Sequence, residues 1–205
     1  MTLACASPPV PPLLPDSVQY IFSRLLVLGI SNWPRYISLA AKLIAPGGWL
    51  ECHDIDWVWY SSETGEEVSH EWEWLTEFRK ACEERGLDLR CASRAEERFK
   101  EADLVNVRRW EFRWDWDSEC KGSGIVGEGG EREKDGGNRK RKKEIWEYTK
   151  REVPDGVIVP AVRRALQGRL SDERIEELLM QMRKDLLTGP PKHWWFSVTI
   201  GQKAE

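Results

Sequence analysis

Residues 45–56, Ala-Pro-Gly-Gly-Trp-Leu-Glu-Cys-His-Asp-Ile-Asp, decide the fold of this chain. In front of them, from Pro34 to Ile44, apolar residues recur at steps of three and four, which is typical of a helix that buries one face. Pro46 cannot continue a helix, and the two glycines after it readily adopt the conformation that closes one. The sequence therefore predicts a helix, a Pro-Gly-Gly stop and a short apolar strand from Trp49 to Ile55, which is an α/β arrangement.

Motifs around this unit carry a resemblance to a known family. They are Tyr20-Ile21-x-x-Arg24-Leu25-Leu26, Asn32-Trp33-Pro34 and Pro46-Gly47-Gly48-Trp49-Leu50-Glu51, with the eleven-residue helix between the last two. From about Pro15 to Lys203 the chain resembles class I S-adenosylmethionine-dependent methyltransferases, in particular the fungal group similar to the velvet-complex regulator of secondary metabolism. The resemblance implies an α/β fold with a partial Rossmann-like sheet, strands four to seven of the family, and flanking helices.

The resemblance begins at the family's strand four. The glycine-rich cofactor loop and the acidic residue that holds the ribose belong to the family's amino-terminal half, so they have no counterpart in this chain. The chain is therefore expected to be a truncated form of the family's domain. Gln19 stands where the family usually has an acidic residue, and Phe22 where it often has a histidine, which weakens the case for catalysis.

Two functions of different classes follow from the resemblance. The first is an S-adenosylmethionine-dependent methyltransferase with an unknown methyl acceptor. The second is a catalytically dead, methyltransferase-like interaction module, whose sheet edge, open where the family's strand one would pair, recruits a protein partner. No residue receives a catalytic role, because methyl transfer depends mainly on positioning the acceptor and the sulfonium in line.

The resemblance also implies candidate site residues at the ends of two predicted strands. The residues expected to border the cofactor are Ser23, Arg24 and Leu25. The residues expected to line the mouth where family substrates bind are His53, Asp54 and Trp57. The alternative for both groups of residues is a purely structural role. Arg24 would then be an arginine at the edge of the core, and the second group would be ordinary residues at a strand end.

A metal site is a further reading of the same stretch, because imidazole and carboxylate groups are common ligands. The candidate ligands are Glu51, His53, Asp54 and Asp56. Neighbouring residues on a strand face opposite sides, so His53 and Asp54 are not expected to share one ion, and we predict no metal.

Length and composition indicate one ordinary domain. The 205 residues are 40% hydrophobic, and 31 basic against 35 acidic residues give a net charge of −4, which argues against nucleic acid and anionic membranes as partners. Five cysteines without a CxxC pair favour a reducing compartment, here the cytoplasm or the nucleus. The apolar stretch from Val18 to Ile30 is too short to span a bilayer. Most of the twelve tryptophans lie on predicted elements and are expected to pack in the core.

Two segments are expected to be disordered. Residues 1–15 form a Pro-rich tail, and residues 16–205 then form the methyltransferase-like part, interrupted by an insertion at 117–143. Between Lys121 and Gly137, seven of seventeen residues are glycine, so too little apolar surface is present to offset the entropy of ordering. A dinucleotide loop needs a helix directly after its glycines, and the further glycines that follow the Gly-x-Gly-x-x-Gly pattern at 122–127 predict none. The basic run at 139–143 is either solvated linker or a nuclear-import signal.

The remaining apolar patterns predict further elements by their period. They are a buried strand from Val18 to Phe22, a loop from Trp57 to Glu67, a helix from Glu71 to Arg85, a short helix opened by a capping box at 93–96, a strand from Val105 to Trp116, helices at 144–151 and 161–166, a longer helix capped by Ser171, and a last strand from His193 to Gly201 in the place of the family's antiparallel seventh strand.

Overall fold

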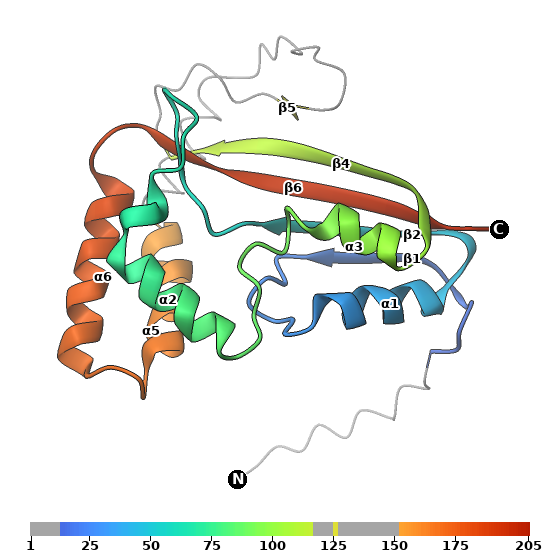
Figure 1. Cartoon of the computed structure of the whole chain (residues 1–205), viewed down its shortest axis with the longest axis horizontal. Coiled ribbons are helices and arrows are strands. Elements are labelled where there is room, and N and C mark those ends of the chain that lie inside the picture. The colour runs from blue at the N-terminus through green and yellow to red at the C-terminus, as the bar shows by residue number, and fades with distance from the viewer. Residues whose placement is uncertain (1–12, 117–124, 127–151) are drawn as a thin grey trace.

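The computed structural model describes residues 13–116, 125–126 and 152–205. The Pro-rich tail up to residue 12, the insertion apart from residues 125–126, the basic run and the predicted helix at 144–151 lie outside these residues. The described chain forms a twisted sheet with helices on one face and a separate group of helices beside it (Figure 1). The predicted α/β class is confirmed.

The elements follow one another from β1 to β6. They are β1 Val18–Arg24, α1 Trp33–Leu43, β2 Ile44–Ile55, β3 Tyr60–Ser61, the 3-10 turn η1 Ser69–Glu71, α2 Glu73–Glu83, α3 Ala95–Glu101, β4 Leu104–Asp115, β5 Ile125–Val126, the π-helical turn η2 Pro154–Ile158, α5 Val159–Leu166, α6 Asp172–Leu187 and β6 Lys192–Lys203. The predicted loop at 57–67 therefore contains a two-residue strand, β3, which pairs with β6.

The sheet has the strand order β1-β2-β6-β4-β5. Strands β1 and β2 are parallel, and β6 is antiparallel to β2 on one side and to β4 on the other. The last strand of the chain is thus inserted between two earlier ones. Its antiparallel direction confirms the expectation for the strand from His193 to Gly201.

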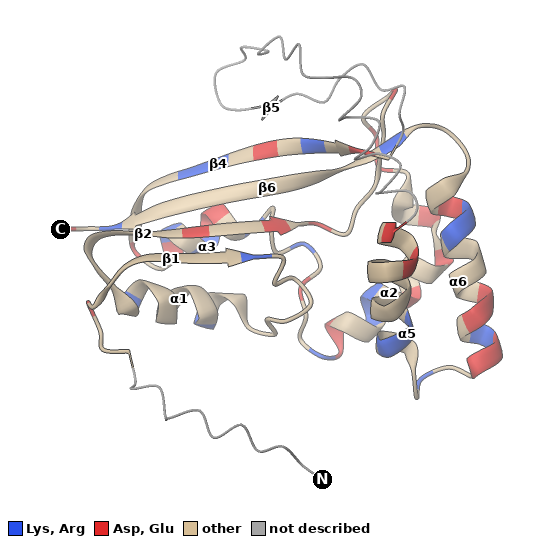
Figure 2. Cartoon of the chain, turned by 180° about the vertical axis from the view of Figure 1, so that it is seen from behind, with Lys and Arg blue, Asp and Glu red and all other residues tan. Residues whose placement is uncertain are grey.

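Helices α1 and α3 cover one face of the sheet (Figure 1). Seen from behind, the strands lie in front, and no helix of the described chain crosses them (Figure 2). The prediction that β1 is a buried strand is wrong, because Tyr20 and Phe22 remain 51% and 49% exposed. Their side chains lie on the uncovered face, where the Tyr20 hydroxyl donates to Glu51 and Phe22 meets the ring of His53. Within the described chain β1 is also an edge strand, paired with β2 alone.

The Pro-Gly-Gly segment does not separate α1 from β2 as predicted. Helix α1 ends at Leu43, and β2 begins at the next residue and runs through residues 46–48. Between the paired positions Val18↔Ile44 and Tyr20↔Trp49, β2 has more residues than β1. The Pro-Gly-Gly segment therefore forms a bulge inside β2. A Cβ atom on Gly48 would lie 2.7 Å from the Gln19 carbonyl oxygen, which explains the need for glycine at this close approach.

Of the three helices beside the sheet, α2, α5 and α6, two had a predicted apolar face, and both predictions are confirmed. In α2 the five predicted residues are all buried: Trp74, Leu75, Phe78, Ala81 and Cys82. In α6 the predicted stripe is also buried: Ile175, Leu178, Leu179, Met182 and Leu186. The hydroxyl of Ser171 accepts the Arg174 N–H at 3.3 Å, so this residue is the N-cap of α6 as predicted.

The capping box predicted for α3 is wrong. Arg94 is the N-cap residue and its side chain makes no capping hydrogen bond. Ser93 instead donates to the carbonyl of Arg90 and belongs to the turn before the helix. The carboxylate of Asp56 accepts the backbone N–H groups of Ala92 and Ser93, so it fixes the turn that precedes α3.

A cluster of tryptophans joins the sheet to the three-helix group. Trp59 is fully buried at its centre, and its ring lies 5.3 to 6.2 Å from five other indole rings, those of Trp57, Trp72, Trp74, Trp116 and Trp194. Aromatic pairs at these separations add to the stability that burial alone provides. The expectation that tryptophans on predicted elements pack in the core is confirmed for Trp74, Trp116 and Trp194. The central Trp59 comes from the predicted loop instead.

Candidate functional site

The carboxyl ends of β1 and β2 lie side by side, because the two strands are parallel and pair Ser23 with Cys52 and Arg24 with His53. In open sheets, ligands bind outside the carboxyl ends of parallel strands. Five of the six predicted site residues gather at this edge: Ser23, Arg24, Leu25, His53 and Asp54. Trp57 follows shortly after β2 but is only 3% exposed and packs against Phe78, with ring centroids 4.7 Å apart.

Two of the gathered residues face the helices and are buried. The Ser23 hydroxyl donates to the sulfur of Cys52 at 3.1 Å. Asp54, which is 5% exposed, accepts the backbone N–H of Leu26 at 2.8 Å. These contacts fix the end of β1 and the loop that follows it.

Asp54 is the most perturbed carboxyl group at this edge. Burial raises its pKa to about 6, against the opposing effect of hydrogen bonds from the backbone of Ile55, Leu26 and Val27, and the charge of Asp56 raises it further. Carboxyl groups that titrate near neutral pH are frequent at catalytic sites, where they transfer protons. In this structure the Asp54 carboxylate accepts a hydrogen bond from the backbone of the β1–α1 loop, at Leu26.

Two other gathered residues lie on the uncovered face. The Arg24 guanidinium is 5.7 Å from the centroid of the Phe196 ring. The His53 ring lies between Phe22 and Phe196, at 4.9 and 5.8 Å, and its Nε2 is 2.5 Å from Glu51 Oε1. His53 and Asp54 therefore point to opposite sides of the sheet, as the alternation of a strand predicts. Among the described residues, no group of three or more His, Cys, Asp or Glu side chains is placed to hold a metal ion.

The residues predicted to border S-adenosylmethionine fit that ligand in part. Arg24 is exposed at the strand end and can pair with a carboxylate such as that of the methionine moiety. Leu25 is 52% exposed, has a φ of 53°, and its N–H donates to the carbonyl of His53 at 2.8 Å, so its side chain is presented outward. Ser23 does not fit, because its hydroxyl is inside the core and bonded to Cys52.

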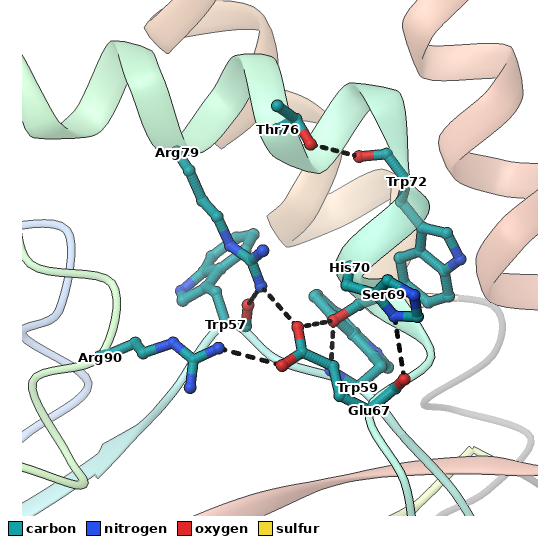
Figure 3. Close-up of polar contacts among 9 residues, drawn as sticks. All are labelled: Trp57, Trp59, Glu67, Ser69, His70, Trp72, Thr76, Arg79 and Arg90. Atoms are coloured by element: carbon teal, nitrogen blue, oxygen red, sulfur yellow. Dashed lines mark hydrogen bonds and ion pairs between the residues drawn. The ribbon is translucent and has the colours of Figure 1, made fainter.

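Sequence reasoning missed a polar network behind Trp57, drawn in Figure 3. Glu67 lies between two arginines, with Arg79 Nη2 at 3.4 Å and Arg90 Nη2 at 3.1 Å. Arg79 also donates to the Trp57 carbonyl at 2.9 Å. The Ser69 hydroxyl donates to Glu67 and accepts the Trp59 N–H, so the network ties the loop after β2 to α2. The partners stand 12 and 23 residues from Glu67, too far apart for any local pattern to reveal them.

No protein-family model matches the sequence, and neither does any of the curated proteins. Solved structures do share parts of its architecture. They include phosphoethanolamine N-methyltransferase 2 from Haemonchus contortus in complex with S-adenosyl-L-methionine (15% identity, TM-score 0.46, 95% of this chain and 35% of that one).

Two further structures have similar scores. The [4+2]-cyclase SpnF shares 14% identity with a TM-score of 0.38, over 94% of this chain and 52% of that one. The cyclopropane synthase MmaA2 from Mycobacterium tuberculosis shares 15% identity with a TM-score of 0.37, over 91% and 56%. The chain spans only about a third to a little over half of the length of these proteins. Likeness at this level assigns no reaction to the chain.

No helix among the described residues is long and apolar enough to cross a membrane.

Proposed function

We propose that the chain is the carboxyl-terminal part of an S-adenosylmethionine-dependent methyltransferase, as its motifs imply. The observation that carries this proposal is the sheet, in which parallel β1 and β2 are followed by a last strand, β6, that runs antiparallel to its neighbours. The truncation relative to the family and the link to fungal secondary metabolism are parts of the same proposal. The methyl acceptor is a molecule that reaches the carboxyl ends of β1 and β2.

S-adenosylmethionine, when bound, supplies the methyl group from its sulfonium. The residues of this chain then have positioning roles, which is the main requirement of this reaction. Arg24 would pair with the cofactor carboxylate, and Leu25 would border its apolar part. His53 lies at the acceptor mouth on the uncovered face, while Asp54 holds the β1–α1 loop through Leu26. Trp57 supports this edge from within the core.

Calorimetric titration with S-adenosylmethionine tests this proposal. Wild type should bind in a saturable way, and Arg24→Gln should bind roughly tenfold more weakly, because a hydrogen bond to a charged group is lost. Arg35→Gln, an exposed arginine on α1, is the matched control and should bind like wild type. If folded wild type releases no heat of binding at high ligand concentration, the proposed methyltransferase function is contradicted.

A second candidate function is a catalytically dead interaction module. It is favoured by the free edge of β1 in the described chain and by the exposed rings of Tyr20 and Phe22 beside it. Edge strands with apolar side chains pair with strands of other chains. For this candidate we commit to a second copy of the chain, paired through β1.

Size-exclusion chromatography with light scattering separates the two candidates. The interaction module predicts a dimer that Phe22→Lys dissociates. Leu39→Lys, which replaces a 48% exposed leucine on α1, should leave the dimer intact. A monodisperse, well-folded monomer of wild type contradicts the interaction module.

A further inference from the structure

An open cleft of about 560 Å³ lies on the helix-covered side of the sheet. Its walls are the start of α1, the end of α2, the turn at 86–90 and the start of α3. The volume is in the range of small-molecule sites. Four arginines line it: Arg79, Arg90, Arg94 and Arg98.

The four arginines share two carboxylates. Glu67 accepts from Arg79 and Arg90. Asp88 Oδ2 accepts from Arg94 Nη1 at 3.0 Å and from Arg98 Nη2 at 2.5 Å. One carboxylate for each pair of guanidinium groups leaves donors on every arginine available for another acceptor, because each guanidinium carries five N–H groups.

Both shared carboxylates are held in the ionised form. Burial raises the pKa of Asp88, but hydrogen bonds from Arg98 and from the Arg90 backbone, with the charges of Arg98 and Arg94, lower it overall. Burial likewise raises the pKa of Glu67, and the hydrogen bond and charge of Arg90 outweigh it. With Glu83 on the wall, three carboxylates stand against four guanidinium groups, so the cleft keeps an excess of positive charge.

Two residues that line the cleft each carry a buried donor that has no hydrogen-bond partner within the described part of the chain. The two donors are Nη1 of Arg98 and Nε1 of Trp33. Buried donors are nearly always paired in folded proteins, so each such atom calls for an acceptor. Trp33 is 4% exposed and begins α1, an eleven-residue helix whose amino-terminal end attracts anions.

The opposing walls are in contact at one point. Gly86 has a φ of +73°, and a Cβ atom there would lie 3.2 Å from the carbonyl oxygen of Ser31. The turn after α2 therefore packs directly on the residue before the N-cap of α1, Asn32. This contact holds the turn at 86–90, which carries Arg90, against the start of α1.

We propose that this cleft binds the oxyanion of a small molecule, a phosphate or a carboxylate, with Arg94 and Arg98 as its direct contacts. Both residues line the cleft: the side chain of Arg98 is 13% exposed and carries the unpaired Nη1, and the side chain of Arg94 is 55% exposed. Guanidinium groups bind both oxyanions through paired N–H donors. Cofactor binding at the strand ends is not required for this site.

Calorimetric titration of the whole chain with inorganic phosphate and, separately, with malonate tests the proposal at constant ionic strength in sodium chloride. Wild type should bind at least one probe saturably at one site, and the tighter probe identifies the class of anion. Arg94→Gln and Arg98→Gln should each weaken binding roughly tenfold. Arg183→Gln, which removes an arginine paired with Asp155 on η2, is the matched control and should bind like wild type.

Two results would overturn the proposal: no saturable binding of either probe by folded wild type, or unchanged affinity in Arg94→Gln. Because Arg98 also pairs with Asp88, circular dichroism is used to check that Arg98→Gln folds. If Arg98→Gln does not fold, the test rests on Arg94→Gln, since Arg94 is more exposed. Phosphate or malonate binding without S-adenosylmethionine binding would support this inference and contradict the proposed enzyme, so the two failures are distinguishable.

Discussion

Replacing Asp54 by asparagine should change the pH dependence of stability. As the pH rises from acidic to alkaline, the variant should gain stability relative to wild type. Asp54 is 5% exposed, and its carboxylate accepts the N–H of Leu26 across the end of β1. An asparagine has nearly the same shape, and its side-chain oxygen can accept the same N–H. Asparagine never carries a buried charge, and its amide nitrogen cannot accept the Ile55 N–H that Asp54 Oδ1 accepts at 3.1 Å. The cost of that lost hydrogen bond does not depend on the ionisation of the side chain, so the pH dependence reports the buried charge.

The size of the effect follows from the pKa of Asp54. Burial raises this pKa from its ordinary value of 3.8 to about 6 in the folded chain. Between these two values the folded carboxyl still holds a proton that the unfolded one has released. The stabilisation is therefore fully present below about pH 4 and is lost as the pH rises through about 6. Two pKa units at about 1.4 kcal/mol each amount to about 3 kcal/mol of unfolding free energy.

Urea unfolding at pH 4 and pH 8, followed by tryptophan fluorescence, measures this quantity. The difference in unfolding free energy between Asp54→Asn and wild type should shift by about 3 kcal/mol in favour of the variant from pH 4 to pH 8. Asp155→Asn, at an exposed aspartate paired with Arg183, is the control and should differ from wild type by less than about 1 kcal/mol at both pH values. A difference for Asp54→Asn that does not change with pH, or changes in the other direction, refutes the reasoning.

Four further substitutions test the packing and the helix caps. Trp59→Ala empties the centre of the tryptophan cluster and should lower the unfolding free energy by about 3–5 kcal/mol in urea, and a loss below 1 kcal/mol would contradict its central place. Gly201→Ala would put a Cβ atom 2.8 Å from the Phe99 ring and should cost about 1–3 kcal/mol, seen as a lower melting temperature. Ser171→Ala should cost about 1 kcal/mol through loss of the α6 cap, whereas Ser93→Ala should cost clearly less, and equal losses would contradict the assignment of caps.

Elements with a long apolar period were predictable from the sequence. Helices α2 and α6 bury the predicted residues, because packing against one core selects one face of each helix. Strand β6 was also predictable in place and direction, the direction coming from the resemblance. The exposure of β1 was not predictable from the sequence. An apolar run looks the same in a central strand and in an edge strand, and only the pairing of the whole sheet decides which of the two positions the strand takes.

The candidate site was predictable only in its position along the chain. The strand ends bring Arg24 and His53 together, because parallel pairing aligns them. The inward turn of Ser23 depends on which face α1 covers, and this is a tertiary property. The arginine cleft was not predicted, since Arg79 and Arg98 come from different helices and meet only through loop closure. Its sequence signal is the recurrence of arginine at 90, 94 and 98, a four-residue step that places basic groups along one side of a turn and helix.

The segment between β1 and α1, residues 25–32, connects the strand ends with the arginine cleft. At its start, Asp54 accepts the Leu26 N–H, and the Leu26 carbonyl in turn accepts the N–H groups of Gly29 and Ile30. At its end, Ser31 packs on Gly86, beside the cleft. A ligand held by Arg94 and Arg98 against the start of α1 would therefore restrain the same short segment whose other end Asp54 fixes. We expect both ligands to favour the same conformation of this segment, so occupation of the cleft and binding at the β1–β2 edge should strengthen each other by an equal factor.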